Sequence, residues 1–115
     1  MEIDGINVNK GLTMYRNKIK IYKRLLADFL KDGNEKHKHM NDTFADKNIA
    51  LYTTHVHGLR SAADAIAADK LSQAAKLLED AGNRGDWDYI DAHNADFLLE
   101  LKTLLENIDG ELCKI

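Results

Sequence analysis

The sequence predicts an all-α protein: an up-and-down antiparallel four-helix bundle with one or two extra short N-terminal helices. Apolar residues recur at helical spacing along almost the whole chain, and no segment alternates apolar and polar residues as a half-buried strand does. Proline, which would interrupt helices, is absent. A length of 115 residues with 44% hydrophobic residues suits one core. We therefore expect a single domain over residues 1–115, with 1–10 as an N-terminal arm.

The first half of the chain predicts one short helix and two further ones. A turn of helix is expected near residues 10–15, followed by a long helix over about 17–32. Gly33-Asn34 is expected to end that helix, because glycine readily adopts the left-handed conformation after a helix. A weaker helix over about 35–46 follows. The long helix has an apolar face at the spacing of a core-facing helix, formed by Tyr22, Leu25, Leu26, Phe29 and Leu30.

The second half predicts three helices, each preceded by an aspartate that suits the N-cap position. Asp46, Asp69 and Asp86 are the expected caps of helices over about 47–66, 70–82 and 87–109, respectively. The connections between these segments are short, and short connections favour antiparallel neighbours in a bundle.

Charge and composition exclude several classes of function. The formal net charge is −3, from 16 basic and 19 acidic residues, which argues against nucleic acid or an anionic membrane as the partner. Cys113 is the only cysteine, so no internal disulfide can form. Residues 1–4 lack the pattern of a secretory signal, and no apolar run approaches the ~20 residues of a membrane span. We therefore expect a cytoplasmic protein that makes no membrane contact.

Most of the five histidines look structural or solvated. His37 and His39 are two residues apart and do not share a helix face. No cluster of cysteine, histidine and carboxylate residues has the spacing of a zinc site. His93 is expected to be a half-buried packing residue beside the apolar face of the last helix. The sequence thus predicts no metal site.

His57 stands out because helical geometry places it away from the core. With Leu59 at the centre of the apolar face, His55 lies on its flank and His57 lies about 160° away. Gly58 beside it is unfavourable inside a helix by about 1 kcal/mol relative to alanine, which suggests that a bare surface is needed there. Arg60, one turn further on, carries a donor fork suited to a phosphoryl or carboxylate group.

Residues 57–63, which read His-Gly-Leu-Arg-Ser-Ala-Ala, resemble the His-x-Leu-Lys-Gly/Ser signature of histidine-phosphotransfer (HPt) domains. The likeness covers nearly the whole chain. It continues through residues 66–71, residues 75–79 and Gly85-Asp86, and upstream it includes residues 5–12, Tyr22 and Phe29. The chain differs from the usual pattern at three positions. Arg60 replaces a lysine, and Ser61 replaces the commoner glycine. Ala67 also replaces a glycine, so the turn after the helix lacks its usual left-handed residue.

The resemblance implies that His57 accepts a phosphoryl group and relays it between aspartates of response-regulator receiver domains. It implies a phosphocarrier with no ATP site and no bound cofactor, for which the partner receiver domain supplies Mg²⁺. The expected partners are receiver domains and a hybrid sensor histidine kinase, of which such a domain can form the C-terminal part. We expect a monomer.

Specific roles follow for the residues around His57. Arg60 is expected to stabilise the phosphoryl group, and Glu79 on the next helix to hold the imidazole ring. Small or polar residues should leave room for the partner to close over His57: Gly58, Ser61, Ala62, Asp64 and Ala65. The alternative is a phosphorylation-silent bundle that acts as a protein-binding module. A DNA-associated or metal-binding regulator is opposed by the charge and the ligand spacing.

Overall fold

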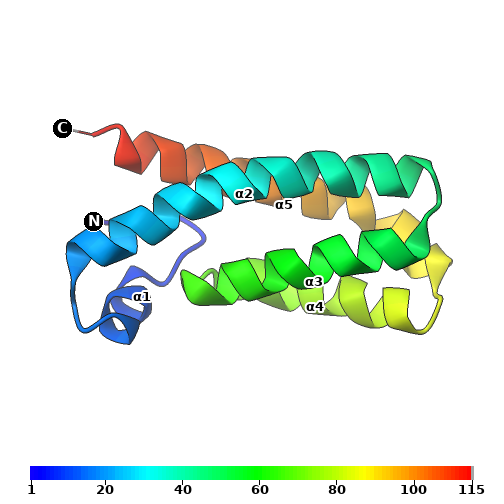
Figure 1. The fold of residues 1–115 in the computed structure, drawn as a ribbon, viewed down its shortest axis with the longest axis horizontal. Coiled ribbons are helices and arrows are strands. Elements are labelled where there is room, and N and C mark those ends of the chain that lie inside the picture. The colour runs from blue at the N-terminus through cyan, green and yellow to red at the C-terminus, as the bar shows by residue number, and fades with distance from the viewer. Residues whose placement is uncertain (115) are drawn as a thin grey trace.

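The computed structural model describes residues 1–114, and within that range it holds five α-helices. A short helix, α1 (Val8–Met14), precedes four long ones, α2 (Ile19–Ala45), α3 (Ile49–Ala65), α4 (Asp69–Asn83) and α5 (Trp87–Leu112). The long helices run up and down along one axis (Figure 1). The described part of the chain measures 42 × 23 × 18 Å.

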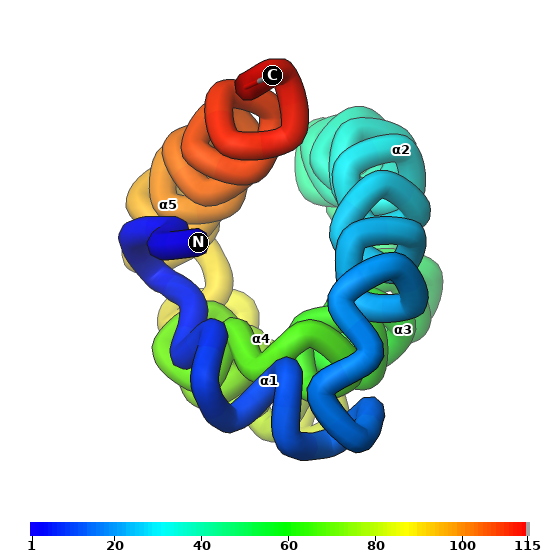
Figure 2. The backbone as a smooth tube through the Cα atoms, turned by 90° about the vertical axis from the view of Figure 1, so that its left-hand side faces the viewer, coloured from blue at the N-terminus to red at the C-terminus, as the bar shows by residue number. Residues whose placement is uncertain are grey.

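The four long helices enclose one core. Seen end-on in Figure 2, they follow one another around it in the order α2, α3, α4 and α5, and α5 closes the ring against α2. Each helix contributes fully buried apolar side chains, among them Leu26, Tyr52, Leu59, Leu71, Ile90 and Leu101. The predicted four-helix bundle with a short N-terminal helix is confirmed. Within residues 1–114, no helix has the length and apolar character needed to cross a membrane.

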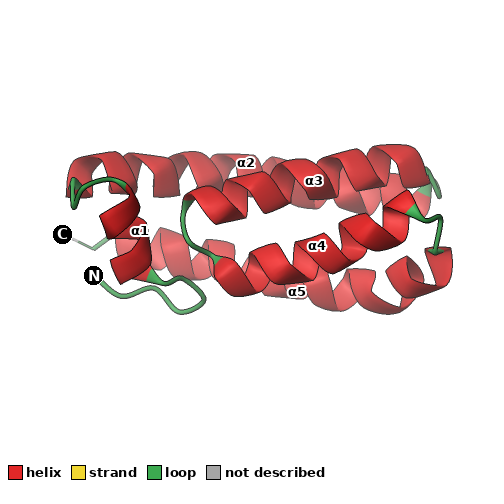
Figure 3. Cartoon of the chain, turned by 90° about the horizontal axis from the view of Figure 1, so that it is seen from below, coloured by secondary structure: helices red, strands yellow, loops and turns green. Residues whose placement is uncertain are grey.

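The N-terminal segment and α1 fill one end of the bundle. At 27 and 26 residues, α2 and α5 are longer than α3 and α4, which have 17 and 15. The N-terminal segment and α1 lie at the end where α3 and α4 stop (Figure 3). The Asn7 N–H donates to the Ala67 carbonyl at 3.0 Å, and the Tyr22 hydroxyl donates to the Ile66 carbonyl at 2.8 Å. These bonds fix the turn that follows α3.

The expected break at Gly33-Asn34 is wrong, because α2 continues through it to Ala45. Gly33 is buried against α5: a Cβ atom built on it would lie 2.6 Å from Leu105 Cδ2. The glycine therefore permits close approach of two helices and does not end one. The two helices expected over 17–32 and 35–46 are a single helix.

One of the three expected caps is correct. Asp86 caps α5, with its side chain accepting from the Tyr89 N–H at 3.1 Å. Asp46 does not cap α3. That role falls to Asn48, whose side chain accepts from the Leu51 N–H at 3.2 Å. Asp69 does not cap α4 either, because it is the first residue of that helix and its side chain makes no capping hydrogen bond. Its negative charge there interacts favourably with the helix dipole.

The turn between α3 and α4 contains an alanine in the left-handed region. Ala67 has φ of +62° and is fully buried. This conformation costs an L-residue roughly 1–2 kcal/mol. Ala67 therefore adopts the left-handed conformation that the sequence associated with glycine, and the Asn7 N–H donates to its carbonyl.

Candidate functional site

His57 lies at the midpoint of α3, on the face turned away from the core. Apolar side chains on the opposite face, including Tyr52, Val56 and Leu59, are fully buried and fix the rotation of the helix. The His57 side chain is 61% exposed. The imidazole that the sequence placed on the surface therefore protrudes into solvent from a rigid helix.

Glu79 of α4 lies beside the His57 ring. In Figure 3, α3 and α4 run side by side on one face of the bundle. The distance from His57 Nδ1 to Glu79 Oε2 is 2.7 Å. The Glu79 side chain is only 12% exposed, so packing restricts its position. The ring nitrogen nearer the backbone is thus occupied, and Nε2 is the ring nitrogen that points away from Glu79.

Arg60 contacts the other oxygen of the same carboxylate, with 3.0 Å between its Nη1 and Glu79 Oε1. The carboxylate therefore bridges His57 and Arg60. The sequence predicted that Glu79 contacts the His57 ring and that Arg60 lies near it. It did not predict the ion pair between Arg60 and Glu79. Nothing in the sequence pattern links positions 60 and 79, because their contact depends on the register of α4 against α3.

The bridged carboxylate determines which ring nitrogen carries the hydrogen. Partial burial acts to raise the pKa of the Glu79 carboxyl, but the hydrogen bonds and charges of His57 and Arg60 outweigh it, so the pKa lies below its ordinary value. The carboxylate is ionised at neutral pH and can only accept hydrogen bonds. Nδ1 of His57 must then donate, which leaves the lone pair of a neutral ring on Nε2.

This arrangement predicts a pH dependence that can be measured. Glu79 should titrate below the ordinary value of 4.5 in the folded protein. Its ionised-state contacts then contribute stability above the ordinary carboxyl range, and this contribution is lost as the pH falls through the lowered pKa. Carboxyl-detected NMR titration gives the midpoint directly. In Arg60→Ala, the midpoint should rise towards 4.5.

The stability difference between the wild-type protein and Glu79→Gln provides the matching thermodynamic test. It should be largest at neutral pH and should shrink as the solution is acidified into the range where Glu79 protonates. A Glu79 carboxyl that titrates at or above the ordinary value would contradict the bridged arrangement.

The residues expected to bind a partner occupy the same side of α3, in two groups. Ser61 and Asp64 are exposed, and Asp64 accepts a hydrogen bond from Ser72 of α4. Ala62 and Ala65 are half-buried and line a groove of about 270 Å³ between α2 and α3. The groove is mainly apolar, with two acidic residues at its edge. Its remaining lining residues are Leu25, Asp28, Phe29, Asp32 and Ile66.

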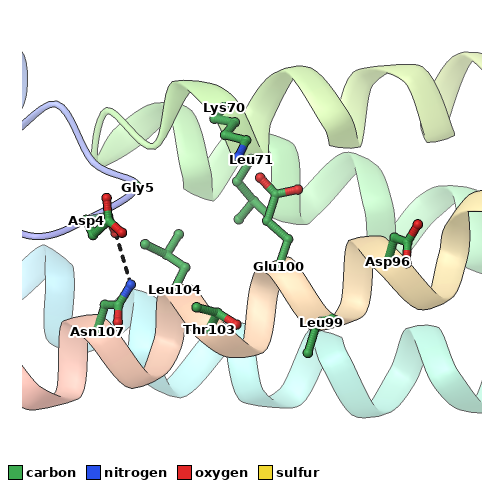
Figure 4. Close-up of a pocket in the computed structure, with 10 residues that line it drawn as sticks. All are labelled: Asp4, Gly5, Lys70, Leu71, Asp96, Leu99, Glu100, Thr103, Leu104 and Asn107. Atoms are coloured by element: carbon green, nitrogen blue, oxygen red, sulfur yellow. Dashed lines mark hydrogen bonds between the residues drawn. The ribbon is translucent and has the colours of Figure 1, made fainter.

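A larger groove lies elsewhere, between α4, α5 and the N-terminal segment (Figure 4). There the Asn107 side chain donates to the Asp4 carbonyl at 3.3 Å. None of His57, Arg60 and Glu79 lines this groove. The chemistry that His57 could perform is therefore located on a protruding helix surface, where a partner's active site can reach it.

Three of the other histidines pack against another aromatic ring. The rings of His39 and His55 lie 4.9 Å apart between α2 and α3. His93 is exposed and stacks on Tyr89 at 4.0 Å, so its expected half-burial is wrong. Within residues 1–114, no three histidine, cysteine or carboxylate side chains are grouped so that they could hold a metal ion.

Comparison with protein families identifies the class of protein. The family model described as "Hpt domain" matches residues 24–111, which is most of the chain. The protein therefore belongs to the histidine-phosphotransfer family, whose members are phosphocarriers of phosphorelays and interact with receiver domains. Searches of curated proteins and of solved structures found no match.

Proposed function

We propose that His57 is the phosphoryl-accepting residue of this domain, and that it takes the group from a receiver-domain aspartate and passes it to another receiver. The observation that carries this proposal is the contact of 2.7 Å between His57 Nδ1 and the Glu79 carboxylate on an exposed helix. In the neutral form of the ring, this contact leaves the free lone pair on Nε2, the nitrogen that points away from Glu79.

The step is a displacement at phosphorus. The Nε2 lone pair attacks the aspartyl phosphate, an N–P bond forms, and the P–O bond to the aspartate breaks. The bonding electrons leave with the aspartate carboxylate, and the imidazole ring gains a positive charge. Glu79 lies where it compensates that charge through Nδ1–H. Transfer to a second receiver is the reverse step, with a new aspartate as the nucleophile.

Few chemical groups are required from the phosphocarrier itself. Phosphoryl transfer depends mainly on positioning and on stabilisation of charge. The receiver domain would bring Mg²⁺ and its own acidic residues. Gly58, Ser61, Ala62, Asp64 and Ala65 would form the surface on which it docks, next to the apolar groove between α2 and α3. We expect a transient contact at the small end of the range for protein interfaces, below ~1,200 Å².

A two-receiver assay tests the proposal. A receiver domain labelled on its aspartate is mixed with this chain, and a second unlabelled receiver is added later. We expect label on this chain that is stable in base and labile in acid, followed by label on the second receiver. A folded chain that binds receivers without taking label would instead be a phosphorylation-silent binding module. Hybrid histidine kinases are the natural source of candidate receivers.

A further inference from the structure

Arg60 is already paired in the unphosphorylated protein. Its guanidinium donates to Glu79 Oε1 at 3.0 Å, and Glu79 also accepts from His57. The Arg60 charge is therefore largely balanced by the Glu79 carboxylate. A phosphoryl group adds roughly 1.5 to 2 negative charges at neutral pH. Glu79 therefore already engages the Arg60 guanidinium before this added charge arrives.

Lys36 of α2 supplies a cation from the other side of α3. A Cβ atom built on Gly58, the residue after His57, would lie 3.1 Å from Lys36 Cε and 3.5 Å from Nζ. The Lys36 side chain therefore lies across the bare backbone of Gly58. Within residues 1–114, Lys36 takes part in no ion pair.

The surroundings of Lys36 agree with a cation directed at this part of α3. Lys36 is half-buried, which limits how far its stem can move. His55, two residues before His57, has a pKa below its ordinary value, first because it is partly buried and then because of the nearby charges of His39 and Lys36. The ammonium group therefore acts electrostatically on the helix that carries the acceptor.

We infer that Lys36 is a phosphoryl-binding residue, which donates from α2 to the oxygens of the group on His57 while Glu79 holds Arg60 on the α4 side. This inference rests on the proposed function. Gly58 has a distinct purpose in this arrangement, because the absence of a Cβ atom leaves the space that the tip of Lys36 occupies against α3. The sequence indicated a bare surface at Gly58 but not which side chain occupies it.

The test has two readouts, the first on the phosphorylated protein alone, where no receiver contact intervenes, and the second with one receiver present. Phosphorus-31 NMR gives the second pKa of the phosphoryl group, and transfer equilibrium with one receiver gives the relative stability of the phosphorylated state. In Lys36→Gln, the phosphoryl pKa should rise, and the equilibrium should shift away from the phosphorylated state roughly threefold to tenfold, as expected for one charge-assisted hydrogen bond. Lys36→Arg should restore both.

Two further variants separate the charge from its position. Lys38→Gln removes the same charge from an exposed site on α2 and should change neither quantity. Gly58→Ala keeps the charge but displaces the Lys36 tip by a few tenths of an ångström, and should give a small part of the Lys36→Gln effect while α3 stays folded.

The outcomes separate this inference from the proposed function. A wild-type protein that takes no phosphoryl group would overturn both. A phosphorylated wild-type protein with the same phosphoryl pKa and equilibrium in Lys36→Gln as in Lys38→Gln would overturn the role of Lys36 alone.

Discussion

Replacing His57 with glutamine is expected to abolish phosphoryl acceptance and to leave the fold intact. The imidazole provides the lone pair proposed to attack phosphorus, since Glu79 engages both Arg60 and Nδ1 and leaves Nε2 free. Glutamine has no comparable nucleophile. Label transferred from a receiver should fall below detection, a loss of more than about 100-fold if the histidine is the acceptor.

The stability of His57→Gln should change little. The side chain is 61% exposed, and pairs at such positions contribute about 1 kcal/mol or less. Denaturant unfolding of both proteins measures this directly. His93→Gln is the matched control, because it removes another exposed histidine and should keep full labelling. Undiminished labelling of His57→Gln would show that the acceptor is a different residue.

The largest expected loss of stability comes from Gly82→Ala. A Cβ atom at Gly82 would lie 1.9 Å from Thr53 Oγ1 and 2.9 Å from Thr53 Cβ, so α3 and α4 would have to separate. Overpacking of this kind costs about 1–3 kcal/mol, and the better helix propensity of alanine offsets at most about 1 kcal/mol of that cost. Chemical denaturation should show a lower midpoint with an unchanged slope.

The same variant should disturb the site, because Thr53 and Gly82 lie about one helical turn from His57 and Glu79. Separation of α3 from α4 would lengthen the contact between the imidazole and the carboxylate. Gly110→Ala is the control. A Cβ atom there meets nothing within 4 Å, so we expect unchanged or slightly higher stability. Adding Thr53→Ala to Gly82→Ala should recover part of the loss, and no recovery would contradict the steric explanation.

Helical periodicity was sufficient to predict the bundle and the exposure of His57. Both depend on which face of a helix is apolar, and that information is local. The predictions were wrong at Gly33, where a contact with another helix decides, and at Asp46, where α3 begins later than expected. Gly33 accommodates Leu105 of α5, and Asn48 takes the capping role expected of Asp46.

For the site, as for the fold, the sequence predicted what lies within one helix and not the contacts between helices. The identity of His57 and its relation to Arg60 follow from spacing within one helix. The pairing of Arg60 with Glu79 and the position of Lys36 across Gly58 join different helices. Such contacts depend on the register and separation of packed helices, which a single sequence does not specify.

The most direct test of the central claim is to locate the phosphoryl group by nitrogen-15 and phosphorus-31 NMR. The protein is labelled with nitrogen-15 in its histidines and phosphorylated by a receiver domain. We predict phosphorus coupled to Nε2 of His57, with Nδ1 still bearing its hydrogen towards Glu79. Phosphorus on Nδ1, on another histidine or on no histidine would contradict the claim.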